Sequence, residues 1–286
     1  MANLVEQLLN ALVLAGLLFL VSAGLSLVFG ILRVVNFAHG VFYMLGAYLG
    51  FTTVALTGWF WPALVVVPPV VGVLGALLEA STLRFIYRRP QIYQLLLTFG
   101  LALILEESIR VIYGPTAKGV EPPVLLQGAI SLGGLLYPSY RLFLVALGIA
   151  VGAAVWLFLR TTRAGLVIRA VAQNSEMADC LGADVARVRT LVFGAACALA
   201  GLGGVAAAPM TTAYLGMGIS VIVEAFVVVV IGGLGSIGGS IVGSLIVGAA
   251  QTWGAFYLPE TAMVIMYAVM GAILVFRPWC LFGEEE

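Results

Sequence analysis

Long uncharged apolar stretches dominate this chain, and short clusters of charged residues, Gly and Pro separate them. Residues 7–32, 34–78, 190–223 and 225–259 contain no Asp, Glu, Lys or Arg. Because a helical membrane span needs about 20 apolar residues, two of these stretches hold one span and two are long enough for a pair. Strands of a membrane barrel would instead alternate apolar and polar positions over about 10 residues. The pattern therefore predicts transmembrane helices, which satisfy their own backbone hydrogen bonds in lipid.

The punctuation between the apolar segments predicts one all-α domain over residues 1–286, a polytopic transmembrane bundle of eight to ten spans. Glycine divides the region 221–258 into short halves, which fit two short helices, one helix with a re-entrant segment, or one broken helix. The spans are expected near residues 8–31, 38–57, 62–86, 93–112, 140–160, 189–208, 221–235, 240–258 and 261–276.

Two segments between the spans are expected to lie outside the membrane. About residues 114–139 are rich in Pro and Gly, and about residues 161–188 hold far more than their share of charge. Lys and Arg concentrate in cytoplasmic loops, so arginine placement indicates the orientation. It predicts a cytoplasmic loop at 161–188, an external loop at 114–139, an external N-terminus and a cytoplasmic C-terminus. The arginines that favour this orientation are Arg84, Arg88, Arg89, Arg160, Arg163, Arg169, Arg187, Arg189 and Arg277.

The composition agrees with a membrane location and argues against several other classes of protein. Hydrophobic residues occupy 63% of the 286 positions and charged residues only 9%, whereas a soluble domain carries roughly 25% charged residues. The formal net charge is zero without a basic run, so nucleic-acid binding has no electrostatic basis. Cys180, Cys197 and Cys280 form no C-x-x-C pair and predict neither a disulfide framework nor a zinc site. The N-terminus lacks the features of a cleaved signal peptide, so the first span is expected to remain.

The charged segment between the fifth and sixth spans has the local signals of two short helices. Residues 166–173 contain no helix breaker, and Asn174 or Ser175 can cap a second helix. Gly182 suits the left-handed position that follows a helix, and Asp184 can cap the next membrane helix. We therefore expect a helical hairpin at the cytoplasmic end of the bundle.

Small side chains on this hairpin favour a docking surface. Met177, Ala178 and Leu181 are expected to share one face of the second helix. Small residues let the backbone of a partner come close, as docking into a groove requires. An ordinary solvated loop with helical character is the alternative. The small residues that stand where a solvated surface would prefer Lys or Glu are Ala170, Ala172, Ala178 and Gly182.

Three motifs in this chain resemble those of branched-chain amino acid ABC transporter permeases. The hairpin contains Arg169-Ala-x-Ala, followed by Ala-x-x-Leu-Gly-x-Asp from Ala178. Near the N-terminus, GLSLVFGILRVVNFAHG begins at Gly24, and near the C-terminus, IGGLGSIGGS begins at Ile231. Gly238 departs from the pattern, because many relatives have Pro there. The resemblance extends in the right order over about residues 5–283.

This resemblance implies that the hairpin docks on a cytoplasmic ATPase and transmits nucleotide-driven closure. It implies three kinds of partner: a second permease, identical or homologous, two cytoplasmic ATP-binding subunits, and an external solute-binding protein. ATP would be used by the partner subunits, and no cofactor is expected on this chain. The residues that the resemblance assigns to ATPase coupling are Arg169, Ala170, Ala172, Ala178, Leu181, Gly182 and Asp184.

Polar residues and glycines within the apolar stretches predict a substrate pathway. Polar groups at membrane depth are costly and tend to mark pathways or cavities. The ten-residue glycine spacing of residues 30–40 recurs at residues 233–243, as expected for paired broken helices at a transporter site. A plain helix–helix hydrogen bond is the alternative for Asn36 and for His39, the only histidine. The candidate pathway residues are Gly30, Asn36, His39, Gly40, Gly233 and Ser236.

The carboxylates of the apolar segments are interpreted as structural. Glu106 and Glu107 stand at helical spacing from Arg110, which favours a local ion pair over a docking site for an external binding protein. Glu79, near an arginine, and Glu224, at the expected outer end of its span, are interpreted as interface anchors or interhelical contacts.

The chain lacks the motifs of an ATPase or of a common hydrolase. It contains no G-x-x-x-x-G-K-[ST], H-E-x-x-H or G-x-S-x-G, and one histidine cannot form a multi-histidine metal site. The expected function is an inner-membrane permease subunit that imports branched-chain amino acids with ATP hydrolysed by separate subunits. A permease for urea, amides or other amino acids is one alternative. A self-sufficient secondary transporter is another, although it would need an ion relay that this chain supplies poorly.

Overall fold

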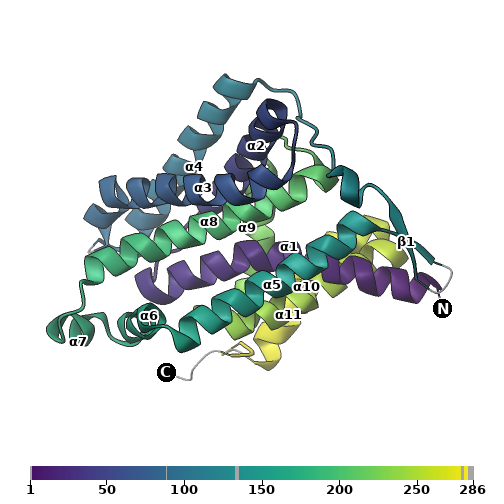
Figure 1. Ribbon diagram of the computed structural model, residues 1–286. Coiled ribbons are helices and arrows are strands. Elements are labelled where there is room, and N and C mark those ends of the chain that lie inside the picture. The colour runs from purple at the N-terminus through teal and green to yellow at the C-terminus, as the bar shows by residue number, and fades with distance from the viewer. Residues whose placement is uncertain (1, 88, 133–134, 278–279, 283–286) are drawn as a thin grey trace.

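The computed structural model describes residues 2–87, 89–132, 135–277 and 280–282. Figure 1 shows a bundle of helices with one small β-hairpin, which confirms the all-α polytopic class. The long helices are α1 (Ala2–Leu32), α2 (His39–Thr57), α3 (Trp61–Ser81), α4 (Gln91–Tyr113), α5 (Ser139–Thr161), α8 (Val185–Thr211), α9 (Met217–Gly232), α10 (Ile237–Tyr257) and α11 (Ala262–Phe276). The shorter elements are α6 (Arg163–Gln173), α7 (Ser175–Cys180), β1 (Ala129–Leu132), β2 (Leu135–Pro138) and the 3-10 turns η1 (Leu83–Ile86), η2 (Val124–Leu126) and η3 (Pro259–Thr261).

Each apolar segment expected from the sequence is helical, but fewer helices qualify as separate membrane spans. In the described ranges, α1, α2, α3, α5 and α8 are long and apolar enough to cross a membrane. The pair α9 and α10 counts as a sixth span, bent by 117° at a short break. Helix α11 has only 15 residues, and α4 carries Gln and Glu near its two ends, which lower its hydropathy. The expected count of eight to ten spans is therefore too high.

Glycine causes the break that separates α9 from α10. Gly233 and Gly235 have φ values of 103° and 86°, a left-handed region that glycine adopts at no steric cost. The Ser236 hydroxyl then accepts a hydrogen bond from the N–H of Gly239 at 3.0 Å and caps α10. Of the arrangements that the sequence leaves open for 221–258, the structure has two helices joined by a sharp break.

Helices α1 and α8 form the centre of the bundle. Helix α8 packs against α1, α2 and α3, while α1 also contacts α5, α9 and α10. In Figure 1 these two helices run side by side, with α3 above them and α5, α10 and α11 below. Glycines allow the closest approaches, since Gly204 of α8 lies directly against the backbone of Tyr43 in α2. Such small-residue contacts are typical of helix packing in membranes.

The two segments predicted outside the membrane lie at opposite ends of α8. Helices α6 and α7 immediately precede its first residue. Beyond its last turn, Lys118 and Ala213 exchange backbone hydrogen bonds of 2.8 and 2.9 Å. The segment 114–139 also contains the antiparallel hairpin of β1 and β2, which the sequence does not predict. Figure 1 places this hairpin away from α6 and α7, and the membrane side that each end faces stays a prediction.

Candidate functional site

The helical hairpin of α6 and α7 has the local geometry that its sequence predicts. Asn174 caps α7, because its side-chain oxygen accepts a hydrogen bond of 2.9 Å from the N–H three residues later. Gly182 has a φ of 90° and follows the helix in the left-handed conformation. Asp184 accepts a hydrogen bond of 3.0 Å from the third N–H of α8. All three predicted positions are confirmed.

The inner side of the hairpin packs on the two central helices. Val171 and Ala178 form a buried apolar cluster with Ile31 of α1 and Val192 of α8. This contact fixes the hairpin against the bundle through apolar side chains that come from four helices. The hairpin therefore packs directly on α1 and α8.

The prediction that Met177, Ala178 and Leu181 share one face of the second helix is wrong. Ala178 is only 5% exposed and faces the bundle, whereas Met177 and Leu181 are 58% and 81% exposed. Helix α7 has six residues, and Leu181 already lies beyond its end. A helix of fewer than two turns is too short for its side-chain periodicity to hold through the cap.

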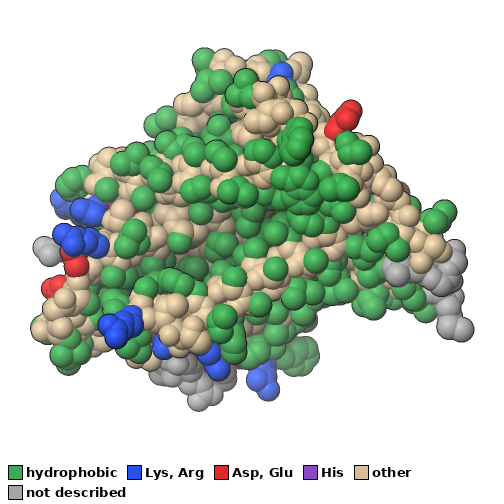
Figure 2. Space-filling view, viewed as in Figure 1, with side chains coloured by type: hydrophobic (Ala, Val, Ile, Leu, Met, Phe, Trp, Pro, Cys, Tyr) green, Lys and Arg blue, Asp and Glu red, His purple; other side chains and the backbone are tan. Residues whose placement is uncertain are grey.

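The outer side of the hairpin presents apolar side chains between charged ones. We call Leu166, Ala170, Met177 and Leu181 the exposed docking face, because all four side chains are exposed. Arg169 is exposed beside it, and its guanidinium donates a hydrogen bond to a carbonyl at the end of α5. Figure 2 shows that most Lys and Arg side chains on the visible side gather at this end of the molecule. Of the predicted coupling residues, Ala172 is half-buried and Gly182 and Asp184 are exposed.

A buried carboxylate connects the corner after α3 to the base of α8. The side chain of Glu79 is fully buried and accepts hydrogen bonds from the hydroxyls of Tyr87 at 2.7 Å and Thr190 at 2.6 Å. Arg84 donates to Thr190 at 2.7 Å and lies 3.9 Å from the carboxylate. Burial raises the pKa of Tyr87 far above its usual value, and the hydrogen bond to Glu79 adds to the shift. The phenol therefore stays protonated and donates, and the predicted interhelical role of Glu79 is confirmed.

Asn36 and His39 are fully buried at the turn between α1 and α2. The side-chain oxygen of Asn36 accepts a hydrogen bond of 3.1 Å from the N–H two residues later. His39 Nε2 lies 3.1 Å from the carbonyl oxygen of Val21 in α1. This contact fits the alternative of a hydrogen bond between helices, whereas a role of these residues in a substrate pathway stays a prediction.

The two glycine-interrupted segments of the chain lie against each other. A Cβ added to Gly30 at the end of α1 would lie 3.2 Å from Cα of Gly235 in the break after α9. Gly40 likewise lies in backbone contact with Gly218, in the first turn of α9. Of the two segments with the repeated glycine spacing, Gly30 therefore lies against residue 235, whereas Gly40 lies against Gly218 outside the second segment, and their part in transport stays a prediction.

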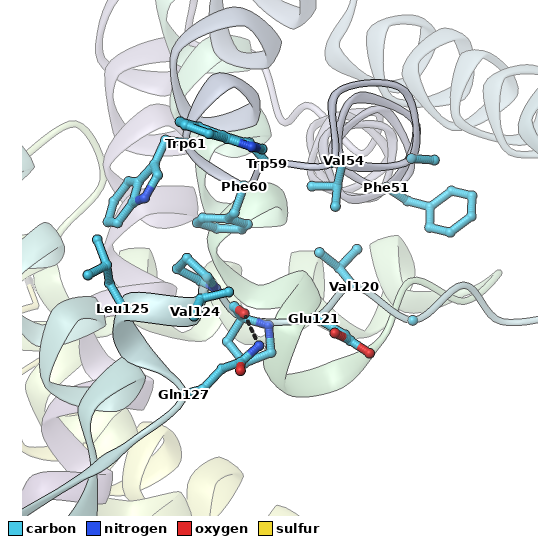
Figure 3. A pocket seen from close by; sticks show the side chains of 15 residues that line it. Phe51, Val54, Trp59, Phe60, Trp61, Val120, Glu121, Val124, Leu125 and Gln127 are labelled. Atoms are coloured by element: carbon cyan, nitrogen blue, oxygen red, sulfur yellow. Dashed lines mark hydrogen bonds between the residues drawn. The ribbon is translucent and has the colours of Figure 1, made fainter.

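An aromatic cavity beside the 114–139 segment was not anticipated. It has a volume of about 540 Å³ and lies between the turn joining α2 to α3 and residues 119–127 (Figure 3). Phe60 and Trp61 face Val124 and Leu125 across it, and Glu121 lies at its edge. The sequence signals that could have predicted this cavity are the three consecutive aromatic residues at 59–61 and the Pro-Pro pair at 122–123. Such aromatic clusters are typical of the membrane–water interface.

The predicted position of Glu224, at the outer end of its span, is also wrong. Helix α9 begins at Met217, so Glu224 lies in the middle of the helix and not at its outer end. Its side chain lines two neighbouring cavities, of about 220 and 550 Å³, together with Leu14 and Gln251. The missed signal was its isolation, because no other charged residue stands between Arg189 and Glu260.

The described part of the chain therefore combines a membrane bundle, two cavities beside Glu224 and a helical hairpin with exposed apolar side chains, and its relatives are transport proteins. The family "Branched-chain amino acid transport system / permease component" matches residues 7–274. The high-affinity branched-chain amino acid transport system permease proteins LivH of Escherichia coli K12 and BraD of Pseudomonas aeruginosa are each 27% identical, over 98% of this chain and 96% of theirs.

A probable branched-chain amino acid transport permease protein LivH of Methanocaldococcus jannaschii is also 27% identical, over 96% of this chain and 91% of its own. No solved structure matches the chain significantly. The family match runs from α1 to α11 and covers almost the whole bundle. This chain belongs to the permease family of branched-chain amino acid transport systems.

Proposed function

We propose that this chain is the inner-membrane permease subunit of an ABC importer for branched-chain amino acids, driven by ATP that separate cytoplasmic subunits hydrolyse. Its membership of the permease family and the names of its relatives support the substrate class. The same names favour branched-chain amino acids over urea, amides or other amino acids. In this proposal the hairpin of α6 and α7 faces the cytoplasm, the N-terminus lies outside and the C-terminus inside.

The exposed docking face carries this proposal. A solvated helical loop would cover its surface with Lys or Glu, yet Leu166, Met177 and Leu181 are 61%, 58% and 81% exposed. Large exposed apolar side chains beside exposed charged residues such as Arg169 favour a protein interaction surface. A short helix with such a face can dock into a groove of an ATP-binding subunit.

The packing of the hairpin supports a mechanical role. Closure of two ATP-binding subunits around nucleotide would displace α6 and α7, and the buried cluster at Val171 and Ala178 would transfer this displacement to α1 and α8. These two helices contact most of the others, so their movement changes access to the interior of the bundle. A second permease, identical or homologous, would complete the pathway, and an external solute-binding protein would deliver the substrate.

A matched pair of substitutions tests the docking face. The complete transporter is reconstituted in liposomes with its ATP-binding subunits and binding protein, and uptake of labelled L-leucine and ATP hydrolysis are measured together. Leu181→Ser should lower uptake per ATP hydrolysed by about tenfold, because a central apolar contact of an interface is worth on the order of 1–2 kcal/mol. Leu125→Ser is the control, since Leu125 is 82% exposed at the other end of the bundle.

Two outcomes would contradict the proposal. Leucine uptake by this chain alone, without any ATP-binding subunit, would identify a self-sufficient secondary transporter. Equal coupling in Leu181→Ser and Leu125→Ser would show that the outer side of the hairpin is an ordinary solvated surface. Competition of leucine uptake by isoleucine and valine, but not by urea, completes the test of the substrate class.

A further inference from the structure

Glu224, in the middle of α9, is the one carboxylate among the described residues that line two neighbouring cavities. Glu224 is half-buried in α9, where the two neighbouring cavities share it with Leu14 of α1 and Gln251 of α10. The larger cavity is open to the surface beside the exposed Phe256 and Met263, and its volume of about 550 Å³ falls within the range of roughly 300–1,000 Å³ that is typical of small-molecule sites. Three helices of the bundle therefore bring a charged group, an amide and an apolar wall to one space.

Of the sixteen residues that line this space, eight are apolar and eight have polar side chains, so it offers both kinds of surface to a small amphiphilic molecule. Within the described residues, the linings of both cavities contain no Lys or Arg. The amide nitrogen of Gln251 lies 3.0 Å from the sulfur of Met266. The other polar side chains of the linings are Gln7, Tyr43, Thr211, Tyr214, Ser220 and Thr252.

Glu224 differs from the carboxylates that have a structural role. In the described chain, Glu79, Glu107 and Asp184 each lie within 4 Å of an arginine, and Glu224 has no basic partner. A carboxylate at membrane depth without a cation is costly, and such residues tend to mark binding sites or pathways. Among the described residues no arginine or lysine forms an ion pair with Glu224, so its carboxylate is free to meet a cation from outside.

We infer that Glu224 binds the ammonium group of an amino acid as it crosses the bundle, with the apolar wall around Leu14 accommodating an aliphatic side chain. A carboxylate only accepts hydrogen bonds, and an ammonium group donates three, so the two are matched in charge and in hydrogen-bonding capacity. The amide of Gln251 and the nearby hydroxyls provide neutral partners for the remaining polar atoms. This inference rests on the proposed transport function and adds a recognition residue to it.

Uptake by charge-neutral and shortened variants tests the role of the carboxylate. Glu224→Gln keeps the size of the side chain and removes the charge, so kcat/KM for L-leucine uptake should fall about tenfold to a hundredfold, as for loss of a charged hydrogen bond. Glu224→Asp keeps the charge and should retain at least about a third of the wild-type uptake. Glu106→Gln, in the half-buried part of α4, is the matched control and should behave as wild type. Wild-type uptake in Glu224→Gln, or equal loss in Glu224→Asp with the complex assembled, would overturn the inference.

A labelling measurement tests the same site without removing Glu224, and so remains valid if a Glu224 variant fails to assemble. Gln251→Cys is introduced together with Cys180→Ser and Cys280→Ser, while the remaining Cys197 is fully buried. The cationic reagent 2-(trimethylammonium)ethyl methanethiosulfonate should react with Cys at 251 at least threefold faster than the anionic 2-sulfonatoethyl reagent, after correction for their reactivity with free cysteine. Adding Glu224→Gln should abolish this preference, and L-leucine should slow the labelling. Equal rates for both reagents would overturn the inference.

The two measurements separate failure of this inference from failure of the proposed function. A wild-type complex that hydrolyses ATP without importing leucine defeats the proposed function, while the labelling preference still reports on cation binding. Normal leucine import by Glu224→Gln would contradict only the inference that Glu224 recognises the substrate and would leave the proposed function intact.

Discussion

The hairpin of α6 and α7 and the glycine-packed centre of the bundle obtain their shapes in opposite ways. The hairpin is shaped by local caps at Asn174, Gly182 and Asp184, and its outer side chains contact little of the bundle. The centre is shaped by backbones in direct contact, such as Gly204 of α8 against Tyr43 of α2. Side-chain volume is therefore constrained in the centre, whereas on the outer side of the hairpin the surface chemistry can vary without loss of the fold.

The largest effect is expected in the glycine-packed centre, from Gly204→Val. An added Cβ would overlap the carbonyl of Tyr43 and lie 2.9 Å from the backbone nitrogen of Ala47. Because backbone cannot move aside as a flexible side chain can, we expect a loss of about 3 kcal/mol or more. Thermal unfolding in detergent measures it. Gly100→Val is the control, since nothing lies within 4 Å of a Cβ added there. Equal stability of the two variants would show that close backbone packing at Gly204 does not limit side-chain volume.

The next effect concerns Glu79 of α3, which is linked to the base of α8 through Thr190. Glu79→Gln replaces one acceptor oxygen by a donor, so one of the two hydroxyls loses its buried partner. We expect a loss of about 2 kcal/mol, below the range for a fully buried ion pair because Arg84 is 43% exposed. The control Glu107→Gln removes an ion pair between exposed side chains and should change stability by less than about 0.5 kcal/mol. Thermal unfolding in detergent measures both losses, and an equal loss in the two variants would contradict the structural role of Glu79.

A smaller effect is expected at the turn after α7, from Gly182→Ala. Its φ of 90° is strained for any residue with a Cβ, although the space around it is open. The backbone conformation alone should therefore lower stability by about 1 kcal/mol. Gly182→Asn should lose less, since Asn tolerates the left-handed region better. Hydrogen exchange of the α7 amides reports this local loss, and an unchanged exchange rate in Gly182→Ala would argue that the turn does not depend on glycine.

The smallest effect on stability is expected on the exposed docking face, from Met177→Asn. Met177 is 58% exposed, so its replacement should change the free energy of unfolding by less than about 0.5 kcal/mol. Binding to the ATP-binding subunits should nevertheless weaken, which co-purification at increasing salt can measure. Ala178→Asn is the matched comparison. Because Ala178 is buried, this substitution should destabilise the hairpin itself. Equal stability of the two variants would show that the hairpin has no distinct inner side.

The predictable parts of the structure depend on interactions between residues close in sequence. The apolar segments became helices, and the caps at Asn174, Gly182 and Asp184 formed, because each depends on hydrogen bonds within a few residues. The inward side of Ala178 was missed because α7 is too short for a reliable periodicity.

The unpredicted parts depend on helices that are distant in sequence. The cavity at Glu224 exists because α1, α9 and α10 meet there, and no local pattern places Leu14 or Gln251 beside that carboxylate. The 117° bend between α9 and α10 follows from two glycine backbone conformations that the sequence allows but does not require. For the candidate site, the helical hairpin of α6 and α7 was therefore predictable and the cavities beside Glu224 were not.

Helix α8 has a mechanical consequence for the whole molecule. Its 27 residues give one continuous helix about 40 Å long, which starts beside the hairpin and ends next to the strand-like pairing of Lys118 with Ala213. If such a rod pivots by about 5° around one end, the other end travels roughly 3.5 Å. That travel exceeds the length of the hydrogen bonds at Lys118, so a slight rocking at one membrane face is enough to remake contacts at the other.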